Sequence, residues 1–172
     1  TDYAAYYFEP SIDRQERNAY IEATERMLVC IDGEPPYIEV TVLKRESYDG
    51  ISFSGNHLYL PPQPWDSVDY LAKVLLAGYG EWGNYGLAYG YADYLYKKAG
   101  MDSRKTDSEA QEVEELLPMG APELYDLNLL CFDEKFVSPE EVEASKNNAS
   151  FFVEDYLSSH SETEFLELLS AS

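Results

Sequence analysis

Residues 65–98 constrain the fold more than any other part of the chain, because their pattern predicts two helices joined by a short turn. The first helix is expected to start near Asp66, and the second near Leu87, after a run of closely spaced glycines. Gly100 is expected to cap the end of the second helix. Side chains recur at helical spacing at Val68, Leu71, Leu75 and Tyr79, and again at Leu87, Tyr91, Tyr94, Leu95 and Lys98.

The chain before this stretch predicts one helix and a small sheet. Residues 11–31 carry apolar side chains at helical spacing, and turn residues follow them. Strands are predicted at residues 37–43, 51–53 and 57–60, and prolines end the last of them. Residues 1–64 should therefore form a helix-plus-sheet part.

The chain after residue 100 is predicted to be mainly helical. Residues 108–117 and 138–157 have helix-capping starts at Ser108 and Ser138, and a final helix begins at Ser161. Residues 124–132 are apolar and fit either a strand or a helix. The expected class is α+β, with the N-terminal helix and a small mixed sheet packed on the helices of residues 65–100, and a helical part over 101–172. All of it fits one domain, 1–172.

The charge balance narrows the range of partners. The chain has 12 basic and 33 acidic residues, a formal net charge of −21. Such a surface repels nucleic acids and anionic lipids, so we expect no nucleic-acid partner. Cationic peptides and divalent cations stay compatible with it, as does a purely solubilising role. No apolar run is long enough to predict a membrane span.

The two cysteines, Cys30 and Cys131, form no CxxC pair, which excludes a structural zinc knuckle. They are compatible with one disulfide in an exported protein or with two buried thiols, and the sequence leaves both open. The chain shows no signal peptide and starts at Thr1 without Met, which fits a mature or shortened form.

Two segments resemble helices of the gluzincin metallopeptidases, the HExxH zinc peptidases whose third zinc ligand is a downstream Glu. Residues 86–95, GLAYGYADYL, are similar to the family's W-L-x-E-G-x-A-x-Y helix. Residues 149–157, ASFFVEDYL, followed by FLELL at 165–169, resemble its S-F-V-x-Y-L helix and the helix after it. The resemblance implies a zincin-like fold, in which the strand ending at Leu60 borders the substrate cleft.

The residues that the family's zinc chemistry requires are absent. Zinc needs two His one helical turn apart, with a Glu between them as general base. Aligned with HExxH, residues 73–77 place Lys73, Val74 and Ala77 at these positions, and Tyr89 takes the place of the third ligand. We therefore predict no metal, no cofactor and no catalysis of the family's kind.

Other chemistries have weaker support in the sequence. A zinc site built from Glu81, Asp93 and His57 is one alternative, and His160 should be an exposed turn residue. Residues 78–83 match G-x-G-x-x-G as a string, but a predicted helix precedes them where a dinucleotide site needs a strand.

Aromatic residues around the turn are the remaining candidates for a binding site. They supply contact area at low entropic cost, with an acidic side chain placed to hold a cationic group. These candidate binding residues are Tyr79, Glu81, Trp82, Tyr85 and Tyr89. The competing interpretation is that the aromatics simply fill the space of the missing metal site.

We therefore expect a catalytically inactive peptidase-like domain that serves as a protein- or peptide-binding or structural module of an exported or cell-surface protein. The alternatives are a hydrolase with an atypical site around Glu81, Tyr89 and Asp93, and a purely structural acidic domain.

Overall fold

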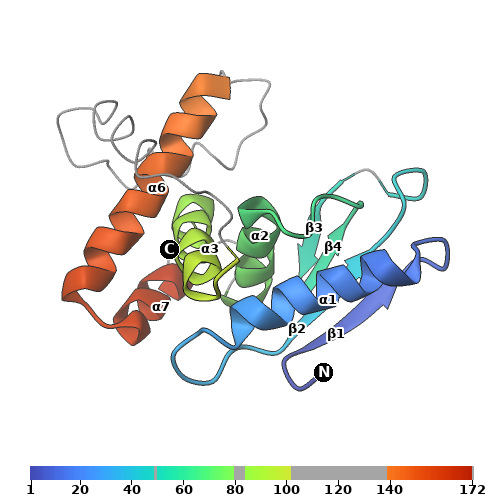
Figure 1. Ribbon diagram of the computed structural model, residues 1–172, viewed down its shortest axis with the longest axis horizontal. Helices are drawn as coiled ribbons and strands as arrows, with labels where there is room; N and C mark the ends of the chain where they lie inside the picture. The colour runs from blue at the N-terminus through green and yellow to red at the C-terminus, as the bar shows by residue number, and fades with distance from the viewer. Residues whose placement is uncertain (49, 80–83, 102–138, 172) are drawn as a thin grey trace.

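A computed structural model describes residues 1–48, 50–79, 84–101 and 139–171. These residues form five helices and a mixed four-stranded sheet, so the predicted α+β class is confirmed (Figure 1). The elements in chain order are β1 (Ala4–Phe8), α1 (Arg14–Leu28), β2 (Ile38–Val42), β3 (Ser52–Ser54), β4 (His57–Leu60), α2 (Val68–Tyr79), α3 (Tyr85–Lys98), α6 (Pro139–Ser159) and α7 (Glu162–Ala171).

The sheet has the strand order β1-β2-β4-β3. β2 pairs in parallel with β1 and with β4, and β3 runs antiparallel to β4 at one edge. β4 therefore lies inside the sheet, and the three-residue β3 forms the edge beside it. The sequence did not predict β1, because its five residues pair with a strand that lies beyond a whole helix. Such a partner leaves no local signal.

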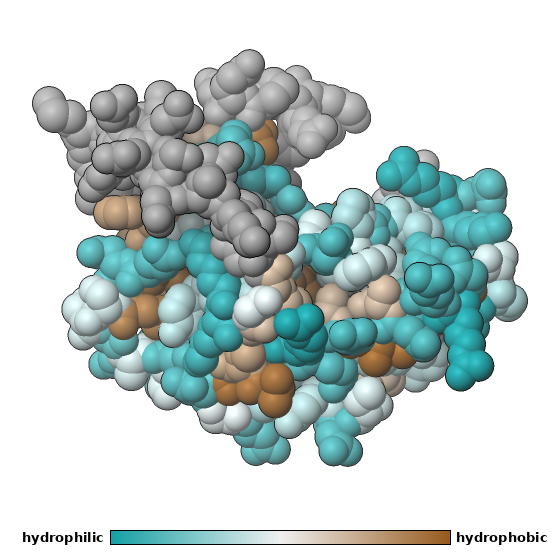
Figure 2. Space-filling view, viewed as in Figure 1, coloured by the Kyte–Doolittle hydropathy of each residue, from teal (hydrophilic) through white to brown (hydrophobic). Residues whose placement is uncertain are grey.

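One face of the sheet is buried and the other is not covered by the described helices. Ile38, Val40, Val42, Leu58 and Leu60 are fully buried, and α1 and α2 pack on this face. The alternate side chains of the same strands are polar or aromatic, as the twofold repeat of a strand requires; Glu39, His57 and Tyr59 are partly buried, and Thr41 is buried. The visible face in Figure 2 is mostly hydrophilic, with small hydrophobic patches, which agrees with the acidic composition.

Helix α1 is shorter than its sequence pattern predicts. The carboxylate of Asp13 accepts hydrogen bonds from the backbone N–H groups of Gln15 and Glu16, at 2.8 and 2.9 Å, and so fixes the first turn at Arg14. The helix ends at Leu28, so residues 29–31, which were expected to continue it, lie in the following turn. The helix therefore begins three residues after residue 11, the start expected from the apolar spacing, because the side chain of Asp13 satisfies backbone N–H groups of the first turn.

Helices α2, α3 and α6 lie in succession away from the sheet (Figure 1). Asn84 caps α3, which begins at Tyr85, two residues before the expected start near Leu87, and Gly100 has φ +65°, in agreement with its predicted capping role. α3 and α6 approach closely at Gly90. A Cβ atom there would lie 2.3 Å from the carbonyl oxygen of Ala149 and 2.6 Å from a methyl group of Val153.

Several predictions lie outside the described residues. They are the helix at 108–117, the apolar segment at 124–132, the cap at Ser138, and the residues Glu81, Trp82 and Cys131. Within the described ranges, none of the helices has the length and apolar character needed to cross a membrane.

Candidate functional site

The four positions that match the zinc motif differ in their surroundings. Val74 and Ala77 are 0% and 3% exposed and belong to the hydrophobic core. Lys73 and Tyr89 are only half-buried. Asp69 lies one turn before Lys73 on α2 and is also half-buried, so these two side chains share the side of the helix that is turned away from the core. Asp69 and Lys73 make polar contacts with side chains of neighbouring elements.

Asp69 and Lys73 belong to a polar group that we call the lysine cluster. It comprises Gln63, Asp69, Lys73, Tyr85 and Lys146. Its members come from the loop after β4, from α2, from the first residue of α3 and from α6. The cluster therefore exists only because the fold brings these elements together.

The ammonium group of Lys73 is the most unusual member of the cluster. It donates one hydrogen bond, of 2.8 Å, to the side-chain oxygen of Gln63. Within the described residues it has no carboxylate at ion-pair distance, although an ammonium group carries three donors. Burial lowers the pKa of Lys73 from its ordinary value of 10.5, Asp69 opposes this shift, and the charge of Lys146 adds to it.

The partner of Lys73 is held rigidly by the core. The hydroxyl of the fully buried Tyr20 donates to the backbone carbonyl of Gln63 at 2.5 Å and accepts from its backbone N–H at 2.8 Å. Tyr20 is part of α1, so one core side chain fixes both main-chain polar groups of Gln63. This arrangement positions the amide side chain that binds Lys73.

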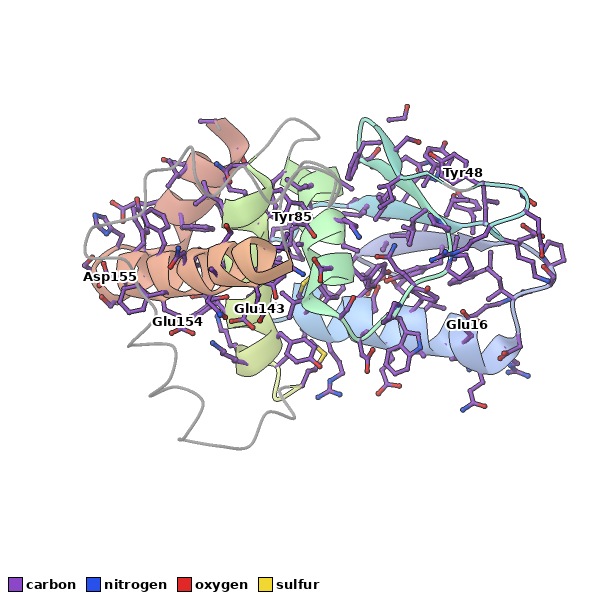
Figure 3. The ribbon with its side chains drawn as sticks, turned by 90° about the horizontal axis from the view of Figure 1, so that it is seen from above. Glu16, Tyr48, Tyr85, Glu143, Glu154 and Asp155 are labelled. Carbon is purple, nitrogen blue, oxygen red and sulfur yellow. The ribbon has the colours of Figure 1, made fainter. Side chains whose placement is uncertain are left out.

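Asp69 is already engaged by two other groups. One of its oxygens accepts from the ammonium of Lys146 at 2.8 Å, and the other accepts from the hydroxyl of Tyr85 at 2.9 Å. The same ammonium lies 5.2 Å from the ring centroid of Tyr89, within the range of a cation–π contact. Figure 3 shows Tyr85 where α3 begins beside α2. The structure thus brings Tyr85 and Tyr89, both predicted binding residues, to one site.

Tyr79, the other described member of the predicted binding set, belongs to different surroundings. Its hydroxyl is buried and has no hydrogen-bond partner among the described residues. Burial raises the pKa of Tyr79 to about 12, and the nearby carboxylate of Glu162 contributes to the shift. α2, which ends at Tyr79, contacts α7, whose first residue is Glu162.

Glu162 organises a second polar group, the glutamate cluster of Asp32, Tyr91, Lys98 and Glu162. The side chain of Glu162 is 5% exposed. One of its oxygens accepts from the hydroxyl of Tyr91 and from the backbone N–H of Asp32, and the other accepts from the ammonium of Lys98 at 3.0 Å. Burial and hydrogen bonding to Glu162 raise the pKa of Tyr91. This cluster ties the start of α7 to α3.

His57 and Asp93, the described residues of the alternative metal site, are engaged elsewhere. His57 on β4 lies 2.7 Å from the hydroxyl of Thr41 and 3.2 Å from a carboxylate oxygen of Glu39. Asp93 is 2% exposed and pairs with Lys97 at 2.9 Å. In the part of the chain that the structure describes, no three His, Cys, Asp or Glu side chains are arranged to hold a metal ion.

Sequence reasoning missed Gln63, Asp69 and Lys146. The spacing of Asp69 and Lys73 was visible as one helical turn, and it was the available signal for a polar pair on α2. Lys146 gives no comparable signal, because it reaches the cluster only through the packing of α6 on α3. No protein-family model, curated protein or solved structure matches the chain.

Proposed function

We propose that this chain is a peptidase-like domain without zinc catalysis, and that it binds a peptide or protein segment beside the lysine cluster. Support for the peptidase-like part comes from the order of the elements and from the resemblance carried by α3, α6 and α7. In this proposal the domain belongs to an exported or cell-surface protein.

The observation that carries the proposal is the positive charge at and beside Lys73, the residue aligned with the first His of HExxH. The ammonium groups of Lys73 and Lys146 flank a single carboxylate, Asp69, which already has two hydrogen-bond donors. A divalent cation would be repelled by these ammonium groups, and neither Lys nor Tyr supplies the His side chains that zinc prefers. The cluster is therefore better suited to hold a ligand than to activate water.

The half-buried tyrosines supply the contact surface. Tyr85 and Tyr89 lie on the first two turns of α3, with their hydroxyl or ring directed to groups of the cluster. Aromatic side chains that combine apolar area with a polar tip commonly anchor protein and peptide ligands. A segment that packs on these rings would also meet the charged groups next to them.

Metal content and peptide turnover test the absence of catalysis. The purified 172-residue chain is expected to contain no stoichiometric zinc and to leave a quenched fluorescent peptide library uncleaved, with or without added zinc. Stoichiometric zinc together with cleavage would overturn this part of the proposal.

Fluorescence polarisation with a library of dye-labelled decapeptides tests binding. Tyr85→Ala and Tyr89→Ala should each weaken the selected peptides by about tenfold or more, the size expected of an anchor residue. Tyr37→Ala, at a site that is 51% exposed, is the matched control and should leave binding unchanged. Equal loss in the control, or no loss in the two variants, would contradict a site at the lysine cluster. Circular dichroism checks that the variants are folded.

A further inference from the structure

We propose that the lysine cluster is a carboxylate-binding site and that it takes a carboxylate of the bound peptide. The inference rests on the proposed function, and it adds the chemical class of the group that the site recognises. The source of the carboxylate is either the C-terminus of the peptide or an Asp or Glu side chain.

The charge balance of the cluster points to an anion. Two ammonium groups face one carboxylate, which leaves one positive charge without a counterpart inside the cluster. This excess occurs in a chain whose formal net charge is −21. A single monoanionic group would balance it, whereas a phosphate dianion would overshoot and would meet the repulsion of the acidic surface.

The donors of the cluster are placed for such a group. Lys73 makes one hydrogen bond, to the neutral amide of Gln63, and its other donors find no carboxylate in the described residues. The side chains of Lys146 and Asp69 are 20% and 37% exposed, so the cluster reaches the surface on their side. An incoming carboxylate oxygen would accept from Lys73, and the second oxygen from Lys146, as charge-assisted hydrogen bonds.

The cluster is ordered before any ligand arrives. Tyr20 fixes the main chain of Gln63, Gln63 holds Lys73, and Tyr85 holds Asp69. Side chains that are already restrained lose little conformational entropy on binding. In addition, a bound anion would oppose the lowering of the Lys73 pKa that burial causes.

Three forms of a peptide selected by polarisation separate the sources of the carboxylate. The first has a free C-terminus, the second a C-terminal amide, and in the third each Asp and Glu is replaced by Asn and Gln. Loss of about tenfold in affinity with the amide assigns the C-terminus, and the same loss with the third form assigns a side chain. Equal affinity of all three forms would overturn the carboxylate site while leaving peptide binding intact.

Variants test whether the cluster provides the recognition. Lys73→Met and Lys146→Met should each lower the affinity of the carboxylate form about tenfold and leave the amide or neutral form unchanged. Lys73→Arg, which keeps the charge, should retain most of the preference. Arg14→Met removes one charge from an exposed position in α1 and is the control for net charge. A preference that survives in both Lys→Met variants would contradict the assignment.

A measurement without peptide separates this inference from the proposed function. The pKa of Lys73 can be followed by NMR of its side chain. N-acetylglycine should raise this pKa, and N-acetylglycinamide should leave it unchanged. A shift with the acid alone would support the carboxylate site even if no peptide bound. No shift with either compound would overturn it.

Discussion

Both polar clusters contain carboxylate, ammonium and phenol groups, and they differ in how their charges are matched. In the glutamate cluster the buried carboxylate of Glu162 receives a phenol, a backbone N–H and the ammonium of Lys98. In the lysine cluster the ammonium of Lys73 donates to one neutral amide oxygen, and a second ammonium lies nearby. A buried charge with matched partners holds elements together, whereas a charge with too few partners raises the free energy of the fold. The comparison suggests that the first cluster is structural and that the second is retained for another role.

The largest effect is expected from separating α3 from α6, the helix that carries Lys146 of the lysine cluster. Gly90→Ala places a methyl carbon 2.3 Å from the backbone oxygen of Ala149, so the two helices must move apart. We expect the free energy of unfolding to fall by about 3 kcal/mol, measured by urea denaturation. Gly50→Ala is the control, because its nearest contacts lie 3.9 Å away, and it should change stability little. Equal stability of the Gly90 variant would mean that the close packing of these helices is wrong.

Removing the charge of Glu162 disrupts the glutamate cluster. Glu162→Gln keeps the shape of the side chain but leaves Lys98 with Asp32 as its remaining carboxylate partner among the described residues. Because Lys98 is 32% exposed, water offsets part of the loss, and we expect a fall of about 2 kcal/mol. Glu167→Gln, at an exposed position of the same helix, should have almost no effect on the urea midpoint. An equal loss of stability in Glu162→Gln and Glu167→Gln would contradict a structural role for the glutamate cluster.

The lysine cluster should respond in the opposite direction. Lys73→Met keeps the length of the side chain and removes a poorly partnered charge, so we expect the free energy of unfolding to rise by about 1 kcal/mol. Lys98→Met, in the glutamate cluster, should lower it instead. Changes of opposite sign in the free energy of unfolding of the two variants, measured by thermal and urea denaturation, would support the comparison. A loss of stability in both variants would contradict it.

The pH dependence of the Lys73→Met difference is the smallest expected effect. Burial holds the pKa of Lys73 in the folded chain below its ordinary value of 10.5, so the unfolded chain binds more protons between the two values. Stability of the native chain therefore rises relative to the variant as the pH rises through this window. The gain from the substitution should shrink toward pH 10.5, the ordinary pKa of the side chain. The buried tyrosines titrate alike in both proteins, so their contributions cancel in the stability difference. A stability difference that widens as the pH rises would contradict the lowered pKa of Lys73.

Much of the helical part was predictable because its signals are local. Apolar spacing and capping residues predicted α2, α3, α6 and α7, with ends that differ by a few residues from those observed. β1 was missed because its pairing with β2 depends on a crossover through α1. A strand of this kind is stabilised by distant neighbours, and its own residues carry little of the information.

The candidate site was predictable only in part. The resemblance directed attention to Lys73 and Tyr89, and both lie at the lysine cluster. Tyr79 was assigned to the same groove, yet its helical spacing with Leu71 and Leu75 already placed it on the core side of α2. Gln63 and Lys146 join the cluster through tertiary packing, which no spacing in the sequence could reveal.

The contact between Tyr20 and Gln63 gives the protein a long-range reporter. One phenol hydroxyl connects the hydrophobic interior at α1 to the loop that supports the amine of Lys73. A change in how α1 packs would alter the reactivity of that amine toward an acylating reagent, without any change in the amine's own neighbours along the chain. The rate at which Lys73 is chemically modified would thus report on the packing of α1 in the hydrophobic core.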